Sequence, residues 1–520
     1  MQTSPPSRGR ANSDGRRASA PHLSSPHLAM RSPLPRGGSS PKIGALETLA
    51  VPLLPPAYVP PELSPTLVWA YAVGHHYNDL CAACWFTYLL VYLEGPSIGL
   101  SETLAGAVML AGQLADGLAT PIVGLLSDRT GPECQIASLG LGRRKLWHAG
   151  GTALVLVNFG LVVFSGLQPF AGDDGATAAY LGTGAALFNV GWAAVQVSYL
   201  SLLPELHPGR VERTRLQAAA YASTVCANLV VFGLFFCGTR LWPDHPFQFV
   251  ALLVTAIGLA TTVLFHRVVR EAGCGAPLAV AAPPPPAGAT AAASAPAADD
   301  DAPVGPAFWF AQPEYHWCCS VYMFTRLLSN LSLTYLAFFV RDALAMPTSA
   351  LSTVPATLYL ASFGATFVQP SLARRLSRAA VYSLGAAACA AACAGCMALP
   401  AAPDALVWAV YPLVVVLGWG STTCMVTSVS SQADLIGARV SSGAFVYGSM
   451  SLLDKLSNGV AIFAIQAHRQ ALAEDAQRDF TRLVLVVGCG GSAVLGAACC
   501  WPLLHHRRLA HPRSRRPSHG

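Results

Sequence analysis

Charged residues are scarce in this chain. Asp, Glu, Lys and Arg make up 11% of its 520 residues, whereas soluble domains carry about 25%. Hydrophobic residues make up 53%. This shortage of charge argues against a soluble globular protein. The net charge of +6 comes largely from the tails and the loops, so we interpret it as a sign of membrane topology and expect no nucleic-acid partner.

Three kinds of functional sequence are also missing. No nucleophile–base constellation stands out beyond His75, His76 and Asp79, so we expect no enzyme. The cysteine cluster at 389–396 has no His or acid in its apolar segment, which favours helix packing over metal binding. We therefore expect neither a metal site nor a cofactor. No short apolar run with a small-residue cleavage site opens the chain, so we expect no signal peptide.

Long apolar blocks are what the chain has in abundance. Each is long enough to cross a bilayer, which takes roughly 20 residues of helix. Twelve such blocks occur, at about 66–93, 102–126, 146–166, 177–203, 217–238, 247–269, 315–340, 349–372, 379–399, 404–430, 441–467 and 482–504. They predict an all-α polytopic membrane protein with twelve transmembrane helices, whose partner is the lipid bilayer.

Composition also predicts the division of the chain. Residues 1–62 are rich in Ser, Pro and Arg, which is typical of a disordered tail. An Ala/Pro-rich linker at 272–312 separates a six-helix half at 63–271 from a second half at 313–505. Paired halves of this kind characterise one large class of transporters, with a site near the membrane midplane. The basic tail at 506–520 is expected to lie against the anionic inner leaflet.

Basic loop residues predict the orientation. The N-terminal tail holds seven Lys and Arg residues, and the even-numbered loops with the C-terminal tail hold eighteen. The odd-numbered loops hold five. Because basic loops stay in the cytoplasm, both termini of this multi-pass protein are predicted to be cytoplasmic.

Five charged residues lie in the interior of the apolar blocks, away from the block ends, where a cation costs roughly 2.5–3.5 kcal/mol at the bilayer centre. Chains that accept this cost usually line a polar pathway with the charge and give it a partner. The pattern therefore indicates a transporter with a charged centre. The five residues are Asp79, Asp116, Arg326, Asp454 and Lys455.

The first two blocks carry acids with polar neighbours. His75 and Asp79 are four residues apart and share a helix face, which suits holding a proton or a substrate. The alternative is a polar pair that hydrogen-bonds a neighbouring helix. Asp116 and Thr120 have the same spacing and suit proton or sodium binding. The alternative for Asp116 is a structural acid that Lys455 neutralises.

The later blocks carry the counter-charges. Asp454 and Lys455 are adjacent, so on a helix they point about 100° apart and do not simply pair with each other. Arg326 presents a planar fork that suits a substrate carboxylate. It can equally fix its helix to a neighbouring one, and the residues leave both interpretations open.

One loop motif resembles a known family. The stretch Gly124–Thr130, which continues to Gly142–Lys145, resembles the cytoplasmic signature after helix 2 of the major facilitator superfamily. Its order is similar to the glycoside–pentoside–hexuronide:cation symporter branch, the melibiose-permease group. Further stretches, above all Ser442–Lys455, are similar to an animal branch. The resemblance covers residues 65–505 and implies the major facilitator fold.

Position by position, the resemblance implies roles. Asp79 falls on the sugar-contacting acid of the symporter branch, Asp116 on an acid of its cation site, and Lys455 on the lysine beside that site. Thr120 and Gln196 stand where the branch has two further acids. The missing acids argue against sodium coupling and sugar specificity, and leave a site compatible with a zwitterionic substrate or with proton coupling.

The resemblance completes a hypothesis for the mechanism. Two halves rock about a central site, and Asp116 pairs with Lys455 when that site is empty. The animal branch implies cysteine import into lysosomes and melanosomes, whose membranes are the expected location, with the plasma membrane as the alternative. A cation-coupled sugar symporter is one alternative function, and a non-transporting membrane scaffold or receptor is another. The expected substrate-binding residues are Asp79, His75, Gln196 and Arg326; those for the cation or proton are Asp116, Thr120, Lys455 and Asp454; those of the cytoplasmic gate are Asp128, Arg129, Arg143 and Arg144.

Overall fold

The computed structural model is all-helical over the residues that it describes, which are 63–130, 136, 141–206, 210–271, 305–436 and 443–510. The tail predicted at 1–62, the stretch 272–304 of the predicted linker and the last ten residues of the predicted C-terminal tail lie outside them. Within the described ranges the structure has no β-strand, and pairs only Ile136 with Leu141 in an isolated bridge.

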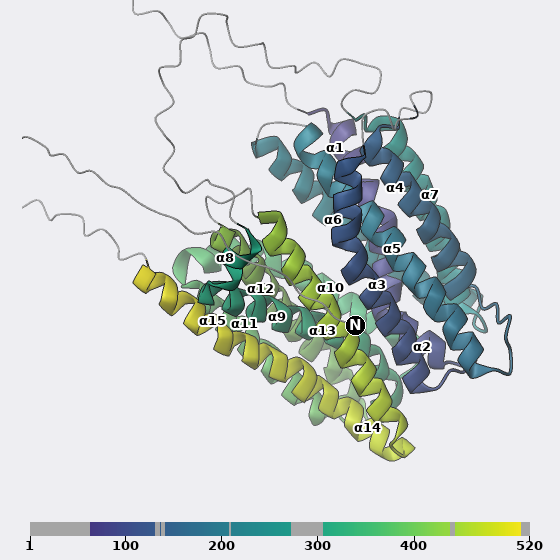
Figure 1. The fold of residues 1–520 in the computed structure, drawn as a ribbon. Helices are drawn as coiled ribbons and strands as arrows, with labels where there is room; N and C mark the ends of the chain where they lie inside the picture. Colours follow the sequence, from purple (N-terminus) through teal and green to yellow (C-terminus); the bar gives the residue numbers. More distant parts are fainter. Residues whose placement is uncertain are drawn as a thin grey trace, which may run out of the picture. The chain divides into compact units, whose positions relative to one another are not determined.

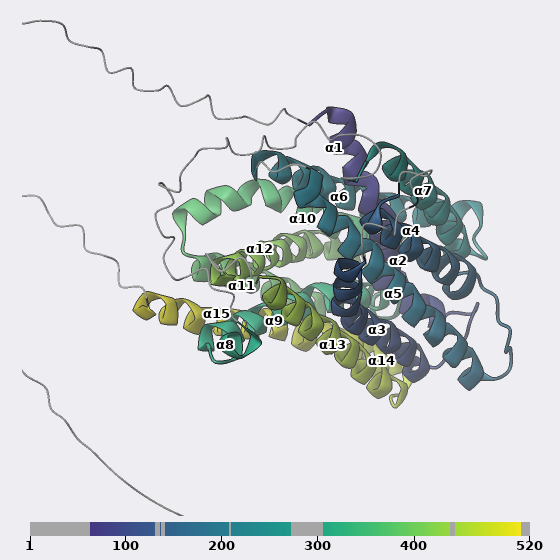
Figure 2. The same ribbon diagram turned by 45° about the horizontal axis from the view of Figure 1, so that its top comes forward.

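The N-terminal helices lie together on one side of the molecule and the C-terminal helices on the other (Figures 1 and 2). The first set comprises α1 (Pro65–Ala72), α2 (His76–Glu94), α3 (Glu102–Arg129), α4 (Arg143–Val155), α5 (Asp174–Leu206), α6 (Arg210–Leu241) and α7 (Pro246–Val268). The second comprises α8 (Pro306–Phe310), α9 (Pro313–Phe338), α10 (Ala350–Arg375), α11 (Arg378–Met397), α12 (Val410–Ile436), α13 (Gly443–Gln470), α14 (Glu474–Leu483) and α15 (Gly491–Ala510).

Short 3-10 and π-helical segments join several of these helices end to end. A 3-10 turn joins α1 to α2, and another precedes α12; π-helical segments follow α4 and α9 and join α14 to α15. The block predicted at 66–93 is therefore two helices with a break between them. Two other helices differ from the predicted boundaries: α8 lies inside the predicted linker, and α15 continues beyond residue 505 into the predicted tail.

Ten of the described helices, counting joined segments as one, are long and apolar enough to cross a membrane. The blocks predicted at 66–93 and 441–467 are not among the ten. Both contain polar and charged side chains, which lower their hydropathy: the buried Asn78 and Asp79 in α2, and in α13 the buried Asp454 and Asn458 with the half-buried Lys455. By length and composition, the structure thus supports a multi-pass membrane protein with at least ten spans.

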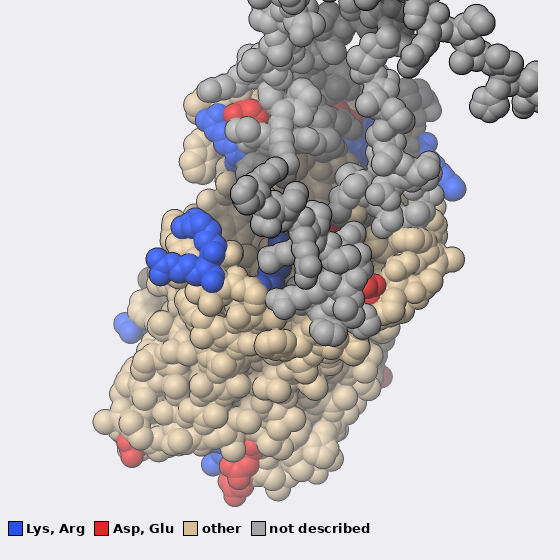
Figure 3. All heavy atoms as spheres, turned by 90° about the vertical axis from the view of Figure 1, so that its left-hand side faces the viewer, with Lys and Arg blue, Asp and Glu red and all other residues tan. Residues whose placement is uncertain are grey.

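The outer surface has the apolar character that a bilayer requires. Large apolar side chains are exposed on many helices, among them Leu118, Leu161, Leu252, Phe367 and Val487 at 58 to 69%. Figure 3 shows a wide band with few charged atoms between charged groups toward the two ends of the helices. Exposed apolar surface of this extent is expected where lipid, rather than water, covers the protein.

Two ends of the helical bundle can be distinguished by their charges. We call the end where α4 begins at Arg143 and α10 ends at Arg375 the basic end. The opposite end, where α2 ends at Glu94, α3 begins at Glu102 and α14 begins at Glu474, is the acidic end. Each end collects the loops of one side, as expected for helices that cross a membrane.

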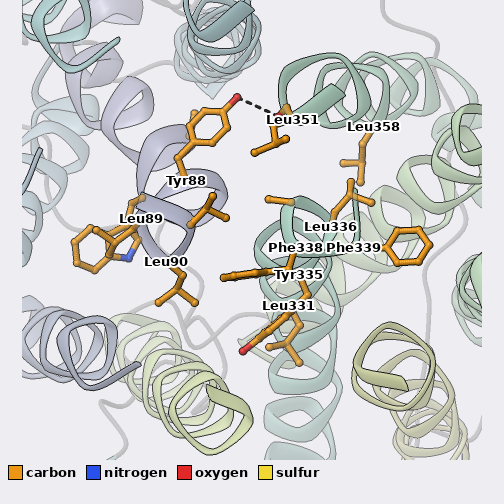
Figure 4. Packing of buried hydrophobic residues seen from close by; sticks show 14 of the residues in the cluster. Tyr88, Leu89, Leu90, Leu331, Tyr335, Leu336, Phe338, Phe339, Leu351 and Leu358 are labelled. Carbon is orange, nitrogen blue, oxygen red and sulfur yellow. Dashed lines mark hydrogen bonds between the residues drawn. The ribbon is translucent and has the colours of Figure 1, made fainter. Parts of the chain in front are cut away.

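The two sets of helices meet through close packing. Gly117 of α3 leaves room for α13, since a Cβ there would lie 3.1 Å from Leu452 Cδ1, and Gly459 of α13 leaves room for α3 in the same way. Small residues allow such close approach between helices in membranes. Toward the acidic end, α2 packs its buried residues against α9 and α10 (Figure 4), and Tyr88 Oη donates to the carbonyl of Leu351 at 3.3 Å.

Candidate functional site

A buried ion pair joins α3 and α13. Lys455 Nζ lies 2.6 Å from Asp116 Oδ1 and donates to Thr120 Oγ1 at 2.9 Å. The hydroxyl of Thr120 donates in turn toward Asp116, one helical turn before it. The side chains of Lys455 and Asp116 are 12% and 10% exposed. The structure thus brings three of the four residues predicted for the cation or proton into direct contact.

A second ion pair joins α9 and α13. Arg326 Nε donates to Asp454 Oδ2 at 2.9 Å. Asn458, which sequence reasoning missed although it lies one turn after Asp454, donates to Asp454 Oδ1 at 2.8 Å. Asp454 is 4% exposed, whereas the side chain of Arg326 is 29% exposed. Arg326 therefore binds α13 through Nε, and its side chain stays partly exposed.

The two ion pairs are neighbours because Asp454 and Lys455 are adjacent in α13, and they have different partners because the two side chains point in different directions. Asp454 faces α9 and Lys455 faces α3, as the angle of about 100° between successive helical residues predicts. The two acids therefore have separate cationic partners, Arg326 for Asp454 and Lys455 for Asp116.

Asp79 lies at the start of α2 with polar partners from two elements. Its Oδ1 lies 3.0 Å from His75 Nδ1, and its Oδ2 accepts the hydroxyl of Thr224 in α6 at 3.0 Å. The adjacent His76 points elsewhere, toward Ser223 Oγ at 2.8 Å. Within the described ranges, no three His, Cys, Asp or Glu residues gather as metal ligands would. Thr224 and Ser223 are contacts that no signal in the sequence distinguished.

Two further residues bear on the predicted substrate site. Gln196 of α5 is half-buried, and the structure gives its side chain no hydrogen bond among the described residues. Tyr359 of α10 was not predicted, yet it lies within electrostatic reach of both Asp79 and Arg326. The predicted substrate residues therefore come from both sets, and Tyr359 lies among their charges.

The residues predicted for the cytoplasmic gate lie at the basic end. Arg144 is buried, donates to Ser127 Oγ at 2.7 Å, and its backbone nitrogen donates to Glu271 at 2.9 Å. These contacts stay within the first set of helices. Arg143 is half-buried and Arg129 is exposed, and the side chain of Asp128 lies outside the described part. Through these contacts Arg144 ties α3, α4 and the segment after α7 together.

A charged network, which sequence reasoning missed, lies at the acidic end. Arg469 NH1 of α13 donates to Glu94 Oε2 of α2 at 2.7 Å, and Arg469 NH2 donates to Asp342 at 3.0 Å. Arg341 also approaches Glu94, at 3.6 Å. Both guanidinium groups lie over the ring of Phe338: that of Arg469 is 4.4 Å from the ring centroid and that of Arg341 is 4.9 Å from it. Three separate blocks end in these residues, but only the fold shows that those ends meet.

We call Glu94, Arg341, Asp342 and Arg469 the acidic-end network. Further contacts between the two sets of helices surround it. Thr334 donates to the carbonyl of Phe86 at 2.9 Å, and Gln466 donates to Glu94. At the rim, Gln477 Nε2 donates to Glu102 at 3.2 Å. Side chains of both sets thus meet along the second half of α2 and at its end.

Comparison with known proteins identifies similar chains. A family model described as MFS/sugar transport protein matches residues 70–468. The chain is 36% identical over 481 residues to major facilitator superfamily domain-containing protein 12 of Homo sapiens, covering 86% of this chain and 94% of that one. For the Mus musculus protein of the same name the identity is 36% over 496 residues, covering 88% and 97%.

Two more distant matches are to proteins named as a symporter and as a nucleoside transporter. An uncharacterised symporter of Synechocystis is 31% identical over 185 residues, which is 34% of this chain and 32% of that one. The solved structure of the nucleoside transporter NupG superposes with a TM-score of 0.56 at 11% identity, covering 84% of this chain and 99% of that one. At this identity the match concerns the fold alone.

Proposed function

We propose that this chain, which belongs to the MFS/sugar transport protein family, is a secondary transporter that moves a small polar solute by alternating access. The buried Asp116–Lys455 pair between α3 and α13 carries the proposal. Charges inside spans are expensive and usually mark the path of an ion or a substrate. A pair that joins the two sets of helices also has to respond whenever those sets move against each other.

The proposed architecture has twelve spans, with α1–α2 and α13 added to the ten that length and composition support. Residues 63–271 and 313–505 form the two moving halves, and both termini are cytoplasmic. The basic loops support this orientation. On this orientation the acidic end faces the organelle lumen or the cell exterior, and the acidic-end network is the closed gate on that side.

The coupling step follows from the ion pairs. A proton or cation that reaches Asp116 competes with Lys455 for its carboxylate, and release of Lys455 loosens α13 from α3. Thr120 supplies one hydroxyl where a second carboxylate would favour sodium, so we propose coupling to protons. The free energy for the movement comes from the difference in affinity between the two conformations.

The proposed substrate is cysteine, because the resemblance to the animal branch implies its import into lysosomes and melanosomes. Asp79 and His75 on one half, and Arg326 on the other, offer partners for an ammonium group and a carboxylate. Gln196 adds an uncharged amide. The lysosomal or melanosomal membrane is the proposed location, with the plasma membrane as the alternative.

A cation-coupled sugar symporter is the second candidate. The match to a sugar-transport family model and to the Synechocystis symporter favours it, and Asp79 suits hydroxyl groups as well as an ammonium group. A scaffold or receptor without transport is the candidate from another class. It would tolerate neutral residues at 79, 116 and 455 together.

Uptake into vesicles tests the proposal. Purified protein in liposomes is given labelled cysteine, with Asp116→Asn as the test variant and Asp475→Asn as the matched control, since Asp475 is 97% exposed at the acidic end. We expect saturable uptake by the wild type and the control, and loss of uptake with Asp116→Asn. Full, unchanged uptake by Asp116→Asn would refute the role of the pair. Uptake of labelled melibiose but not of cysteine would establish the sugar alternative.

A further inference from the structure

The break in the first span contains His75 and lies one helical turn before Asp79, and these are the two predicted substrate residues of this span. It is a 3-10 turn, Val73–His75, that separates α1 from α2. Gly74 sits against Phe265 so closely that a Cβ would lie 2.5 Å from the phenylalanine ring. The carbonyl oxygen of Gly74 does not stay free, because His148 Nε2 of α4 lies 2.9 Å from it. The imidazole of His148 therefore contacts the turn that contains His75 and that leads into the first turn of α2, where Asp79 lies.

Hydrogen bonding assigns the protons of this imidazole. A carbonyl oxygen only accepts, so Nε2 of His148 carries a proton. His148 Nδ1 lies 3.0 Å from His266 Nε2 of α7, and these two atoms cannot both carry one. If His148 were doubly protonated, His266 would have to present a buried Nδ1–H, and that atom has no partner among the described residues. Two neutral rings, with His266 Nε2 donating to His148, satisfy every contact.

The imidazole pair rests on a rigid support. Lys145 Nζ donates to the carbonyls of His266 and Val269 at 2.8 and 2.9 Å, at the end of α7. In return, the Glu271 carboxylate accepts the backbone nitrogens of Arg144 and Lys145 at 2.9 and 3.0 Å, at the start of α4. The start of α4 and the end of α7 thus bond the backbone groups that have no partner within the other helix. His148 and His266 follow within about one turn of these contacts, so their positions are fixed.

We propose that His148 is a positioning residue for the substrate site: through its hydrogen bond to Gly74 it sets the 3-10 turn, and thereby the direction in which His75 and Asp79 point. The inference rests on the proposed function only for the role of Asp79 in binding substrate. His148 does not itself touch the substrate. Its contribution is that Asp79 keeps one orientation, with Thr224 on its other oxygen, and loses less freedom on binding.

Two substitutions separate the two hydrogen bonds of His148. The amide nitrogen of glutamine reaches about as far from the backbone as Nε2 of histidine, and that of asparagine about as far as Nδ1. His148→Gln therefore keeps a donor for Gly74, whereas His148→Asn loses it. His245→Asn, at the exposed turn before α7, is the control for replacing a histidine.

The experiment measures full-length protein in two ways. Hydrogen–deuterium exchange reports on backbone amides at 72–78, and labelled cysteine uptake into liposomes reports KM and Vmax. We expect His148→Asn to exchange faster at 72–78 and to raise KM about tenfold, as for the loss of one buried hydrogen bond. His148→Gln and the control should stay near the wild type. A merely structural role would instead lower Vmax, through loss of folded protein, and leave KM unchanged.

Each outcome decides the proposal. Equal exchange and equal KM for the asparagine and glutamine variants would refute it, as would faster exchange without a change in KM. If the wild type takes up no cysteine, the proposed substrate fails, while exchange at 72–78 still decides whether His148 positions the turn. If His148→Asn does not fold, His266→Leu replaces it: it removes the donor to His148, and faster exchange at 72–78 is again expected.

Discussion

Glu94 offers the sharpest test of how the acidic end closes. Its carboxylate accepts Arg469 NH1 at 2.7 Å and Gln466, and Arg341 lies 3.6 Å away. The substitution Glu94→Gln keeps the size of the side chain and removes its charge. Arg469, which is 5% exposed, then keeps its ion pair with Asp342. We expect the state that is closed at the acidic end to lose stability relative to the open one.

The magnitude follows from burial and from the partner that remains. Removal of one member of a buried ion pair costs about 3–5 kcal/mol when the other charge is left alone. Because Asp342 still binds Arg469, we expect a smaller loss of about 2 kcal/mol. That free energy corresponds to a change of about 30-fold in the ratio of closed to open molecules.

Distance measurements between two spin labels provide the assay. Labels introduced as unnatural amino acids at Ser97, after α2, and at Asp475, in α14, leave the native cysteines untouched and report the separation of the two sets at the acidic end. We expect Glu94→Gln to increase the population with a long distance. Glu102→Gln is the control, since its carboxylate accepts an uncharged amide at the rim. An unchanged distribution in well-folded Glu94→Gln would refute the network as a gate.

Two further predictions concern stability, each measured as the midpoint of thermal unfolding in detergent. Lys455→Met should destabilise the protein by about 3–5 kcal/mol because it leaves Asp116 buried without its cation, and Asp116→Asn in the same chain should restore most of the loss; a double variant as unstable as Lys455→Met would contradict the pairing. Gly258→Ala should cost about 1–3 kcal/mol through overpacking, because the new Cβ would lie 2.0 Å from the ring of Tyr77. Gly233→Ala is the control, since a Cβ there meets open space. Equal unfolding midpoints for the two variants would contradict the prediction and show that α7 can move away from Tyr77.

Much of the candidate site was predictable because charge inside an apolar block is conspicuous. The block pattern located ten helices that the structure supports as spans, and the in-block charges identified Asp79, Asp116, Arg326, Asp454 and Lys455. Helical spacing predicted that Asp454 and Lys455 would point apart. The family was also correctly identified from the loop after the second block. The roles of these residues in binding and coupling stay predictions.

Other features depended on contacts that no local pattern records. Asp454 binds Arg326, and Thr224 binds Asp79, across separations of 128 and 145 residues. The break at Val73–His75 is contacted by His148 and Phe265, which belong to other helices. The apolar block contains no sign of these contacts, and it therefore predicted one continuous helix. Arg341 and Arg469 were assigned to loops by their position at block ends, and the fold instead buries Arg469 against Glu94.

Apolar length, loop charge and motif order are local properties of the chain, so they were enough to predict an α-helical membrane protein of the major facilitator type with charged residues inside its spans. The partners of those charges, the break at Val73–His75 and the network around Glu94 became visible only in the folded protein. An ion pair or hydrogen bond between helices depends on distance and orientation in space. Those are set by how small residues such as Gly117 and Gly459 let the helices pack.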